Sequence, residues 1–278
     1  MRDTLTVIKC GGGEGLDPVR VCPDVAALRA EGGAALVLHG GSAEVERLAA
    51  RLGVPQRRLM TPSGTSSRYT DPATLEVLTL ALAGAVKPRL LAELHRLGVP
   101  AVGLTGIDAG VLRARRSRAH RAVVDGRTVV VRDDHTGRLE SVTVGPLRAL
   151  LDAGLTPVLS PPAVAQDGTV VNVDADRAAA LVAAALGATH LVYLTAAAGL
   201  LRDPADPATL IPHHDVAAPP DADVRGGMAV KLLAGRIALD GGVPRVVIAD
   251  GRLDHPVRRA LDGHGTRLTA LSRSTSGG

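Results

Sequence analysis

Aromatic side chains are nearly absent from this sequence, which has no Phe, no Trp and two Tyr among its 278 residues. Hydrophobic residues nonetheless make up 46% of the chain, so we expect a substantial core built from Leu, Val, Ala and Ile. The bases of single-stranded nucleic acids bind by stacking on aromatic rings. The composition therefore disfavours a platform for single-stranded nucleic acid.

The sequence contains few cysteines. It also has no signal peptide and no apolar run long enough to span a membrane. Cys10 and Cys22 are the two cysteines, and they form neither a Cys-x-x-Cys pair nor a disulfide framework. The N-terminal residues lack the hydrophobic region of a signal peptide, and apolar stretches such as residues 78–86 are too short to span a bilayer. We therefore expect a cytoplasmic protein. Its net charge of +4 suits anionic substrates without requiring them.

Short apolar runs alternate along the chain with longer segments whose apolar residues recur at helical spacing. This succession is typical of a mostly parallel sheet covered by helices, so we predict an α/β fold. We expect strands at residues 4–8, 34–38, 101–104, 157–160, 190–194 and 245–248, and helices at residues 21–31, 43–52, 72–97, 174–186, 228–240 and 256–261.

The middle of the chain has a different pattern. Between residues 121 and 144, β-rich segments are separated by the turn sequences Asp125-Gly126 and Thr136-Gly137. Such spacing is typical of antiparallel hairpins. We therefore predict a β-hairpin insertion in this region.

The chain divides most plausibly near residue 150. We expect an N-terminal lobe of residues 1–150, a C-terminal lobe of residues 151–268 and a flexible tail of residues 269–278. Residues 202–224 hold most of the acids and prolines of the second lobe, and we predict that they form a loop or lid.

Two glycine loops follow the first two predicted strands. Lys9 precedes Gly11–Gly13, and Gly40-Gly41-Ser42 opens a predicted helix. Ligands of open α/β sheets bind at the carboxyl ends of the strands, where glycine N–H groups and helix N-termini can contact phosphate. The lysine comes before its glycines, unlike the order of a Walker loop. Each loop alone could equally be a tight turn, but the two together indicate a phosphate site.

Two further groups of polar residues stand beside predicted helices. Asn172, Asp174 and Asp176 precede an alanine-rich helix, and Lys231 lies four residues after Gly227 on the first turns of another. Either aspartate could simply cap its helix, and the lysine could be solvated. Neither group decides a function alone.

In combination and in order, these segments resemble the amino acid kinase family. The resemblance runs from about residue 7 to residue 265 and rests on the segments KCGGG, HGGSAE, SSRYTD, GLTGID, VVNVDADRAA, VYLTAAAGLL and RGGMAVK. It implies a three-layer αβα sandwich of the carbamate kinase-like type, with the acceptor and the dimer contact on the N-terminal lobe and ATP on the C-terminal lobe. It also implies that ATP, accompanied by Mg²⁺, phosphorylates a side-chain carboxylate to give an acyl phosphate.

The resemblance also assigns five catalytic residues. It implies that Lys9 contacts the transferring phosphoryl group from the acceptor side and Lys231 from the ATP side. Asp176 would hold both lysines, and the N–H groups of Gly12 and Gly41 would face the phosphoryl oxygens. This suits phosphoryl transfer, in which alignment and charge neutralisation do most of the catalysis.

The remaining site residues also follow from the resemblance. Arg68 would clamp the α-carboxylate of the acceptor, a bidentate contact. The full acceptor set is Gly40, Gly41, Ser42, Arg68 and Asn172, and the ATP set is Lys9, Thr195, Ala196, Gly199, Leu200, Arg225 and Lys231, with the stretch 223–225 as a nucleotide loop. Two departures stand out: Ala196 replaces a frequent Asp, and Lys87-Pro88 replaces an Asn-Lys pair.

Within the family, the arrangement is similar to acetylglutamate kinases. It is more similar to the kinases of 2-aminoadipate attached to LysW, a small acidic amino-group carrier protein. Ser42 and Ile107 stand where acetylglutamate kinases usually have glycine and a basic residue.

A run of arginines before the hairpin also bears on whether the acceptor is bound to a carrier protein. Arg113, Arg115, Arg116, Arg118 and Arg121 could dock the acidic carrier. They could instead protect a solvated hairpin edge, or contact nucleic acid, which is the weakest reading.

The preferred function is therefore a homodimeric kinase of carrier-bound 2-aminoadipate or glutamate. Acetylglutamate kinase is one alternative, and a non-catalytic amino-acid or nucleotide sensor on the same fold is another. The two lysines and Asp176 disfavour the sensor. We expect no metal site in the protein itself, because His213-His214 has no obvious third ligand.

Overall fold

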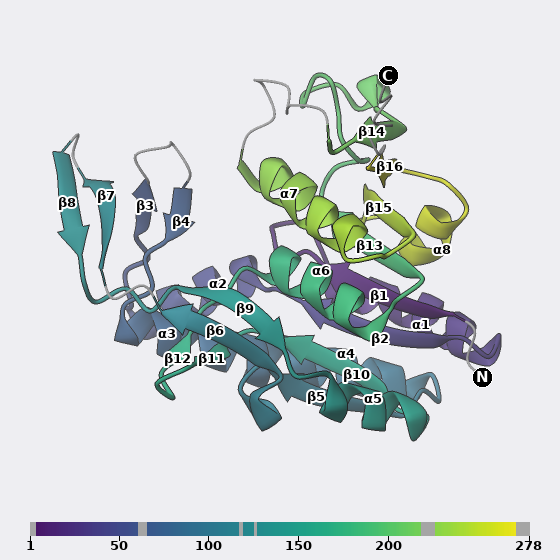
Figure 1. Ribbon diagram of the computed structural model, residues 1–278, viewed down its shortest axis with the longest axis horizontal. Coiled ribbons are helices and arrows are strands. Elements are labelled where there is room, and N and C mark those ends of the chain that lie inside the picture. The colour runs from purple at the N-terminus through teal and green to yellow at the C-terminus, as the bar shows by residue number, and fades with distance from the viewer. Residues whose placement is uncertain (1–3, 61–65, 117–118, 125–126, 218–225, 271–278) are drawn as a thin grey trace, which may run out of the picture.

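A single eight-stranded sheet forms the centre of the computed structural model, which describes residues 4–60, 66–116, 119–124, 127–217 and 226–270. Neighbouring strands are parallel except for the antiparallel pair β15 and β16, and helices cover both faces, which confirms the predicted sandwich (Figure 1). In spatial order the strands are β14 (His213–Asp215), β16 (Thr266–Thr269), β15 (Arg245–Asp250), β13 (His190–Thr195), β1 (Leu5–Cys10), β2 (Ala34–His39), β10 (Thr156–Ser160) and β5 (Ala101–Thr105).

Strand residues alternate between two apolar layers, as the period of two along a β-strand requires. Val7 and Leu191 contribute to one layer, while Ile8 and Val192 contribute to the other. The first layer packs under α5 (Val144–Asp152), α6 (Ala175–Leu186) and α7 (Gly226–Asp240), and the second under α1 (Cys22–Ala30), α4 (Lys87–Arg96) and α8 (Pro256–Leu261).

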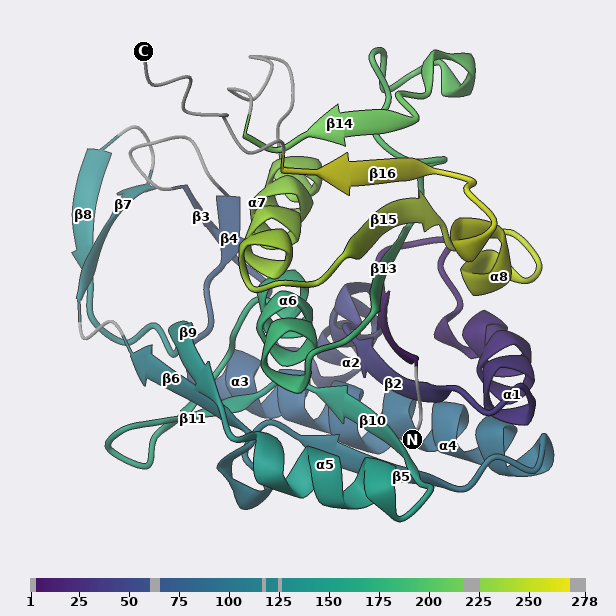
Figure 2. The ribbon, with the colours of Figure 1, turned by 45° about the vertical axis from the view of Figure 1, so that its right-hand side comes forward.

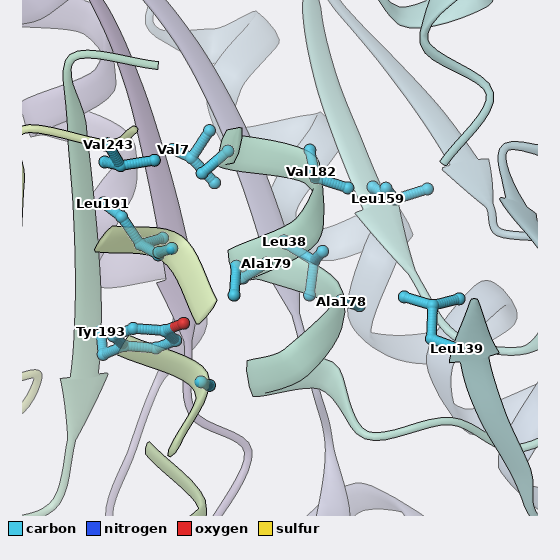
Figure 3. Close-up of a cluster of buried hydrophobic side chains, with 14 of the residues drawn as sticks. Val7, Leu38, Leu139, Leu159, Ala178, Ala179, Val182, Leu191, Tyr193 and Val243 are labelled. Carbon is cyan, nitrogen blue, oxygen red and sulfur yellow. The ribbon is translucent and has the colours of Figure 1, made fainter. Parts of the chain in front are cut away.

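The core contains almost no aromatic volume, so small helix residues complete it. Ala178 and Ala179 of α6 lie fully buried against Leu38, Leu191 and Tyr193 of the sheet, as Figure 3 shows. The Tyr193 hydroxyl donates a hydrogen bond of 3.1 Å to the backbone oxygen of Asp176. The first turn of α6 is therefore tied directly to the sheet.

A continuous helical path covers the predicted segment 72–97. It consists of α3 (Pro72–Thr79), the π-helical η2 (Leu80–Val86) and α4, and α3 starts after Asp71, whose side chain accepts a hydrogen bond from the N–H of Thr74. Helix α2 (Ser42–Leu52) packs against this path. The short helix η1 (Pro18–Val21) leads directly into α1, and the short helices η3 (Asp108–Gly110) and η4 (Pro207–Thr209) lie in loops.

Two smaller sheets complete the fold. One has the order β12 (Val170–Val171), β11 (Ala163–Ala165), β6 (Leu112–Arg116), β9 (Gly137–Val142). The other has the order β4 (Ser66–Arg68), β3 (Arg58–Met60), β7 (His120–Val124), β8 (Arg127–Val131), and it stands out from the body beside α7 (Figure 2).

The hairpin prediction is confirmed for β7 and β8 but wrong for the strand that follows. β7 and β8 pair antiparallel, and their turn, residues 125–126, lies outside the described part of the chain. β9 pairs with β6 in the other sheet, so Thr136-Gly137 does not close a hairpin. The cause is Asp134, a buried carboxylate that accepts hydrogen bonds from the N–H of Thr70 at 3.0 Å and the hydroxyl of Thr136 at 2.7 Å. These contacts hold the chain away from β8.

The second half of the chain departs from the sequence predictions in two places. The predicted loop 202–224 contains β14, an edge strand of the main sheet, and its residues 218–224 lie outside the described part. The predicted tail begins too early, because Thr269 belongs to β16. β10, β11 and β12 follow residue 150 yet lie among strands of the first half, so the division there remains a prediction.

Every described helix is too short or too polar to cross a membrane.

Asp134→Ala should lower the free energy of unfolding by about 2–4 kcal/mol, because it leaves donors of buried Thr70 and half-buried Thr136 unsatisfied. Urea unfolding measures the change. Asp152→Ala, at an exposed position of α5, is the control and should stay within about 0.5 kcal/mol of the wild type. Equal stabilities for the two variants would show that Asp134 does not anchor the chain.

Candidate functional site

The two glycine loops lie against each other at the carboxyl ends of the adjacent parallel strands β1 and β2. A Cβ atom on Gly12 would lie 2.1 Å from the nitrogen of Gly41, so the backbones meet where a side chain could not fit. The carbonyl of Gly12 accepts hydrogen bonds from the N–H of Ala43 at 2.8 Å and the hydroxyl of Ser42 at 2.7 Å. The loops therefore form one surface that includes the N-terminus of α2.

A buried carboxylate joins two lysines beside these loops. The Nζ atom of Lys9 lies 2.7 Å from Oδ1 of Asp176, and the Nζ atom of Lys231 lies 3.1 Å from Oδ2. Their side chains are 7%, 8% and 11% exposed for Lys9, Asp176 and Lys231, respectively. The structure thus brings together three of the predicted catalytic residues, from β1, α6 and α7.

From the sequence, either Asp174 or Asp176 could cap α6. The structure shows which of the two does. The carboxylate of Asp174 accepts a hydrogen bond of 2.7 Å from the N–H of Arg177 and caps the helix. Asp176 therefore has no capping role and faces the lysines. The alternative of a solvated Lys231 is wrong, because its ammonium group is buried in the ion pair.

Electrostatics keeps Asp176 ionised. Burial would raise the pKa of Asp176, but the charges and hydrogen bonds of Lys9 and Lys231 outweigh burial and hold the pKa below its usual value. Burial and the charge of Asp176 raise the pKa of Asp174. One carboxylate thus faces two lysines, and the cluster can accept further negative charge.

A cleft of about 450 Å³ opens next to this cluster. It contains the predicted acceptor residues Ser42, Arg68 and Asn172 on its polar side. Its complete lining is Ser42, Arg58, Ser67, Arg68, Thr136, Asn172, Val173, Asp174, Ala175, Arg177, Val230, Leu233, Ala234 and Ile237.

Two predicted acceptor residues are oriented by neighbouring side chains. The guanidinium of Arg68 donates to the side-chain oxygen of Gln56 and, at 3.2 Å, to the carboxylate of Glu46. Burial lowers the pKa of Arg68. The amide nitrogen of Asn172 donates to the hydroxyl of Thr70 at 3.3 Å. Gly40 lies at the end of β2, and its N–H donates to the Cys10 carbonyl at 3.2 Å.

The predicted nucleotide loop follows β13. Thr195 is half-buried and Ala196 is exposed. Gly199 has φ +158, and a Cβ atom there would lie 2.6 Å from the Thr266 hydroxyl oxygen. Leu200 is buried, and its N–H donates to the same hydroxyl at 2.8 Å, so this residue supports the loop from inside. Arg225 lies outside the described residues.

The predicted docking arginines are partly engaged within the chain. Arg113 and Arg115 are exposed on β6, and Nε of Arg115 lies 2.9 Å from Oε1 of Glu140. Nε of Arg116 donates to the backbone oxygen of Asp134 at 3.3 Å. Arg118 and the side chain of Arg121 lie outside the described part of the chain.

His39 and Cys10, at the ends of β2 and β1, are buried. Burial lowers the pKa of His39 to about 4 and raises the pKa of the Cys10 thiol to about 12, so both groups stay neutral. His213 and His214 lie in β14. Among the described residues, no group of three or more His, Cys, Asp or Glu could hold a metal ion.

The predicted site residues did not include Arg58, Arg177 or the apolar residues of α7, all of which line the cleft. Arg58 gave no signal, because its strand meets the cleft only in the folded sheet. Arg177 did give a signal in the sequence. It directly follows Asp176 in the first turn of a helix, where a cation is unfavourable because of the helix dipole.

Several kinases are similar to this chain over most of its length. LysW-aminoadipate kinase from Deinococcus radiodurans is 42% identical over 94% of this chain and 90% of the relative. The kinase of the same name from Thermus thermophilus is 41% identical over 94% and 99%. Acetylglutamate kinase from Methanocella arvoryzae is 35% identical over 95% and 89%.

Solved structures agree on the fold. N-acetylglutamate synthase from Neisseria gonorrhoeae, complexed with coenzyme A and L-arginine, has a TM-score of 0.74 and 27% identity over 97% of this chain and 62% of that chain. Giardia carbamate kinase has a TM-score of 0.66 and 13% identity over 96% and 99%.

The amino acid kinase family itself matches residues 4–250, a range that contains the two glycine loops, the cleft and both lysines. With its sandwich fold, its paired lysines and these relatives, the chain belongs to the amino acid kinase family.

Proposed function

We propose that this enzyme transfers the γ-phosphoryl group of ATP to the side-chain carboxylate of 2-aminoadipate or glutamate attached to an acidic carrier protein of the LysW type. The contact of Lys9 and Lys231 with one carboxylate, beside two touching glycine loops, carries this proposal. The names of the relatives at 41% and 42% identity support the choice of acceptor.

The chemistry fits the charges. An acceptor carboxylate oxygen forms a bond to the γ-phosphorus while the bond to the β,γ-bridging oxygen breaks, giving an acyl phosphate and ADP. Two anions must approach, so cations and N–H dipoles have to compensate their repulsion. Lys9 acts from the acceptor side and Lys231 from the nucleotide side, and Asp176 holds both. The N–H groups of Gly12 and Gly41 bind the phosphoryl oxygens.

Arg68 and Asn172 orient the amino-acid part of the acceptor in the cleft. The loop with Thr195, Ala196 and Gly199, together with Arg225, holds ATP. Mg²⁺ accompanies ATP and is held mainly by its phosphates and water, because the two lysines already occupy Asp176.

We also propose that the enzyme is a cytoplasmic homodimer and that its carrier docks at Arg113, Arg115, Arg116 and Arg118. The exposed guanidinium groups of Arg113 and Arg115 support the docking. Acetylglutamate kinase is the second candidate, because the relative from Methanocella arvoryzae is 35% identical.

ADP release with two acceptors distinguishes these candidates. We expect turnover with a carrier protein that bears 2-aminoadipate or glutamate, and little turnover with free N-acetylglutamate. Robust activity on N-acetylglutamate alone would establish the second candidate instead.

Lys9→Ala and Lys231→Ala should each lower kcat by about 1000-fold or more, since each removes a charge from the transition state. Each variant keeps an Asp176 ion pair with the remaining lysine, so urea unfolding should show a loss of at most about 2 kcal/mol. Near-normal turnover in either variant would mean that the lysines have other roles.

Asp176→Asn should lower the free energy of unfolding by about 3–5 kcal/mol at pH 7, because it leaves two buried ammonium groups without their counter-charge. The folded-state pKa of Asp176 is lowered. Its contribution is therefore present above the unfolded pKa, near about 4, and is lost as the pH falls through the folded value.

The difference in unfolding free energy between wild type and Asp176→Asn should thus be constant from about pH 5 to pH 8 and shrink in more acidic urea titrations. A difference that grows on acidification would contradict this account of the cluster.

A further inference from the structure

Arg177 is a cation on the wall of the cleft. In the part of the chain that the structure describes, its guanidinium has no ion pair or hydrogen bond, and its Nε atom is buried. Arg68, on the same cleft, is held by Glu46 and Gln56. The two arginines therefore differ: the guanidinium of Arg68 is held by protein groups, whereas the guanidinium of Arg177 can still bind an anion.

The position of Arg177 is electrostatically unfavourable in the free protein. It is the third residue of α6, where the helix dipole is positive and a cation is unfavourable. Lys9 and Lys231 lie beside the preceding residue. Asp174 also lines the cleft, but its carboxylate caps the helix at the backbone N–H of Arg177. An anion entering the cleft would compensate the guanidinium charge.

The facing wall restricts what kind of anion fits. Val230, Leu233, Ala234 and Ile237 of α7 line the cleft, and Leu233 is 57% exposed. This strip offers contact to a short chain of methylene groups. A free inorganic anion would leave it unused, whereas an acyl chain ending in a carboxylate would cover the strip and reach the guanidinium.

We propose that Arg177 is a specificity-determining residue that binds a second, non-reacting carboxylate on the acyl group attached to the acceptor's amino nitrogen. This inference rests on the proposed function, in which Arg68 binds the α-carboxylate. The acceptor then has three carboxylates: one that reacts, one at Arg68 and one at Arg177. An N-acetyl group lacks the third, so the cleft selects an N-acyl group that ends in an acidic function.

Isothermal titration of two synthetic ligands tests this without any turnover. N-succinyl-2-aminoadipate has the third carboxylate, and N-acetyl-2-aminoadipate lacks it. We expect the wild type to bind the succinyl ligand about tenfold or more tightly than the acetyl ligand, as a charge-assisted guanidinium contact provides. Arg177→Gln should abolish this preference, and Arg177→Lys should keep part of it.

Arg96→Gln is the matched control, because Arg96 is an exposed arginine of α4 that pairs with Glu93 outside the cleft. It should keep the full preference. A purely structural role for Arg177 would lower the stability of Arg177→Gln and the affinity for both ligands alike. We expect the stability to be unchanged or higher, since the variant removes a cation from the start of α6.

Equal binding of the two ligands by the wild type, a preference retained in Arg177→Gln, or no binding of the succinyl ligand would each overturn the inference. Steady-state ADP release separates this result from the proposed function. Equal binding of the two ligands by the wild type, together with normal turnover of the carrier-bound acceptor, refutes the role of Arg177 alone. An intact preference with no ADP release from any acceptor refutes the proposed function and leaves the anion site in place.

Discussion

The site depends on one carboxylate shared by two ammonium groups. Asp176 is buried between Lys9 of β1 and Lys231 of α7, at 2.7 Å and 3.1 Å. This contact joins strands and helices from opposite ends of the chain and sets the separation of the two lysines. The Tyr193 hydroxyl binds the backbone oxygen of Asp176, which fixes the first turn of α6 to the sheet. The position of both cations is thus controlled from the core.

Much of this arrangement was predictable because parallel strands place their carboxyl ends together. Lys9 and the glycines after β1 and β2 had to meet at one edge once the strands were recognised, and they do. The choice between Asp174 and Asp176 was different. Both aspartates precede the same helix, and only the register of its first turn shows that Asp174 is the cap. The pairing of Lys231 with Asp176 came from the family resemblance, because no local pattern connects them.

The errors have a common physical origin in contacts between distant segments. β9 looked like the partner of β8 because turn residues separate them, yet buried Asp134 binds Thr70 and redirects the chain to β6. The docking surface on β6 stays a prediction, but the pairing of Arg115 with Glu140 from β9 could not be foreseen from the sequence. Arg177 was overlooked because its cleft forms only when α6 meets α7. Spacing along the chain does not encode such contacts.

The site contains a buried group of two lysines and one aspartate, although such a group does not favour stability. A buried ion cluster contributes less to stability than an apolar replacement of similar volume. A kinase that joins two anions needs cations that are not fully neutralised before the substrates bind. One carboxylate shared by two lysines meets this need, since it orients both while leaving the cluster able to accept negative charge. Arg177 adds a further cation to the same cleft, and its buried Nε atom has no hydrogen-bond partner among the described residues. In the proposed function, bound substrates supply negative charge to these cations, so the same charges serve both substrate affinity and phosphoryl transfer.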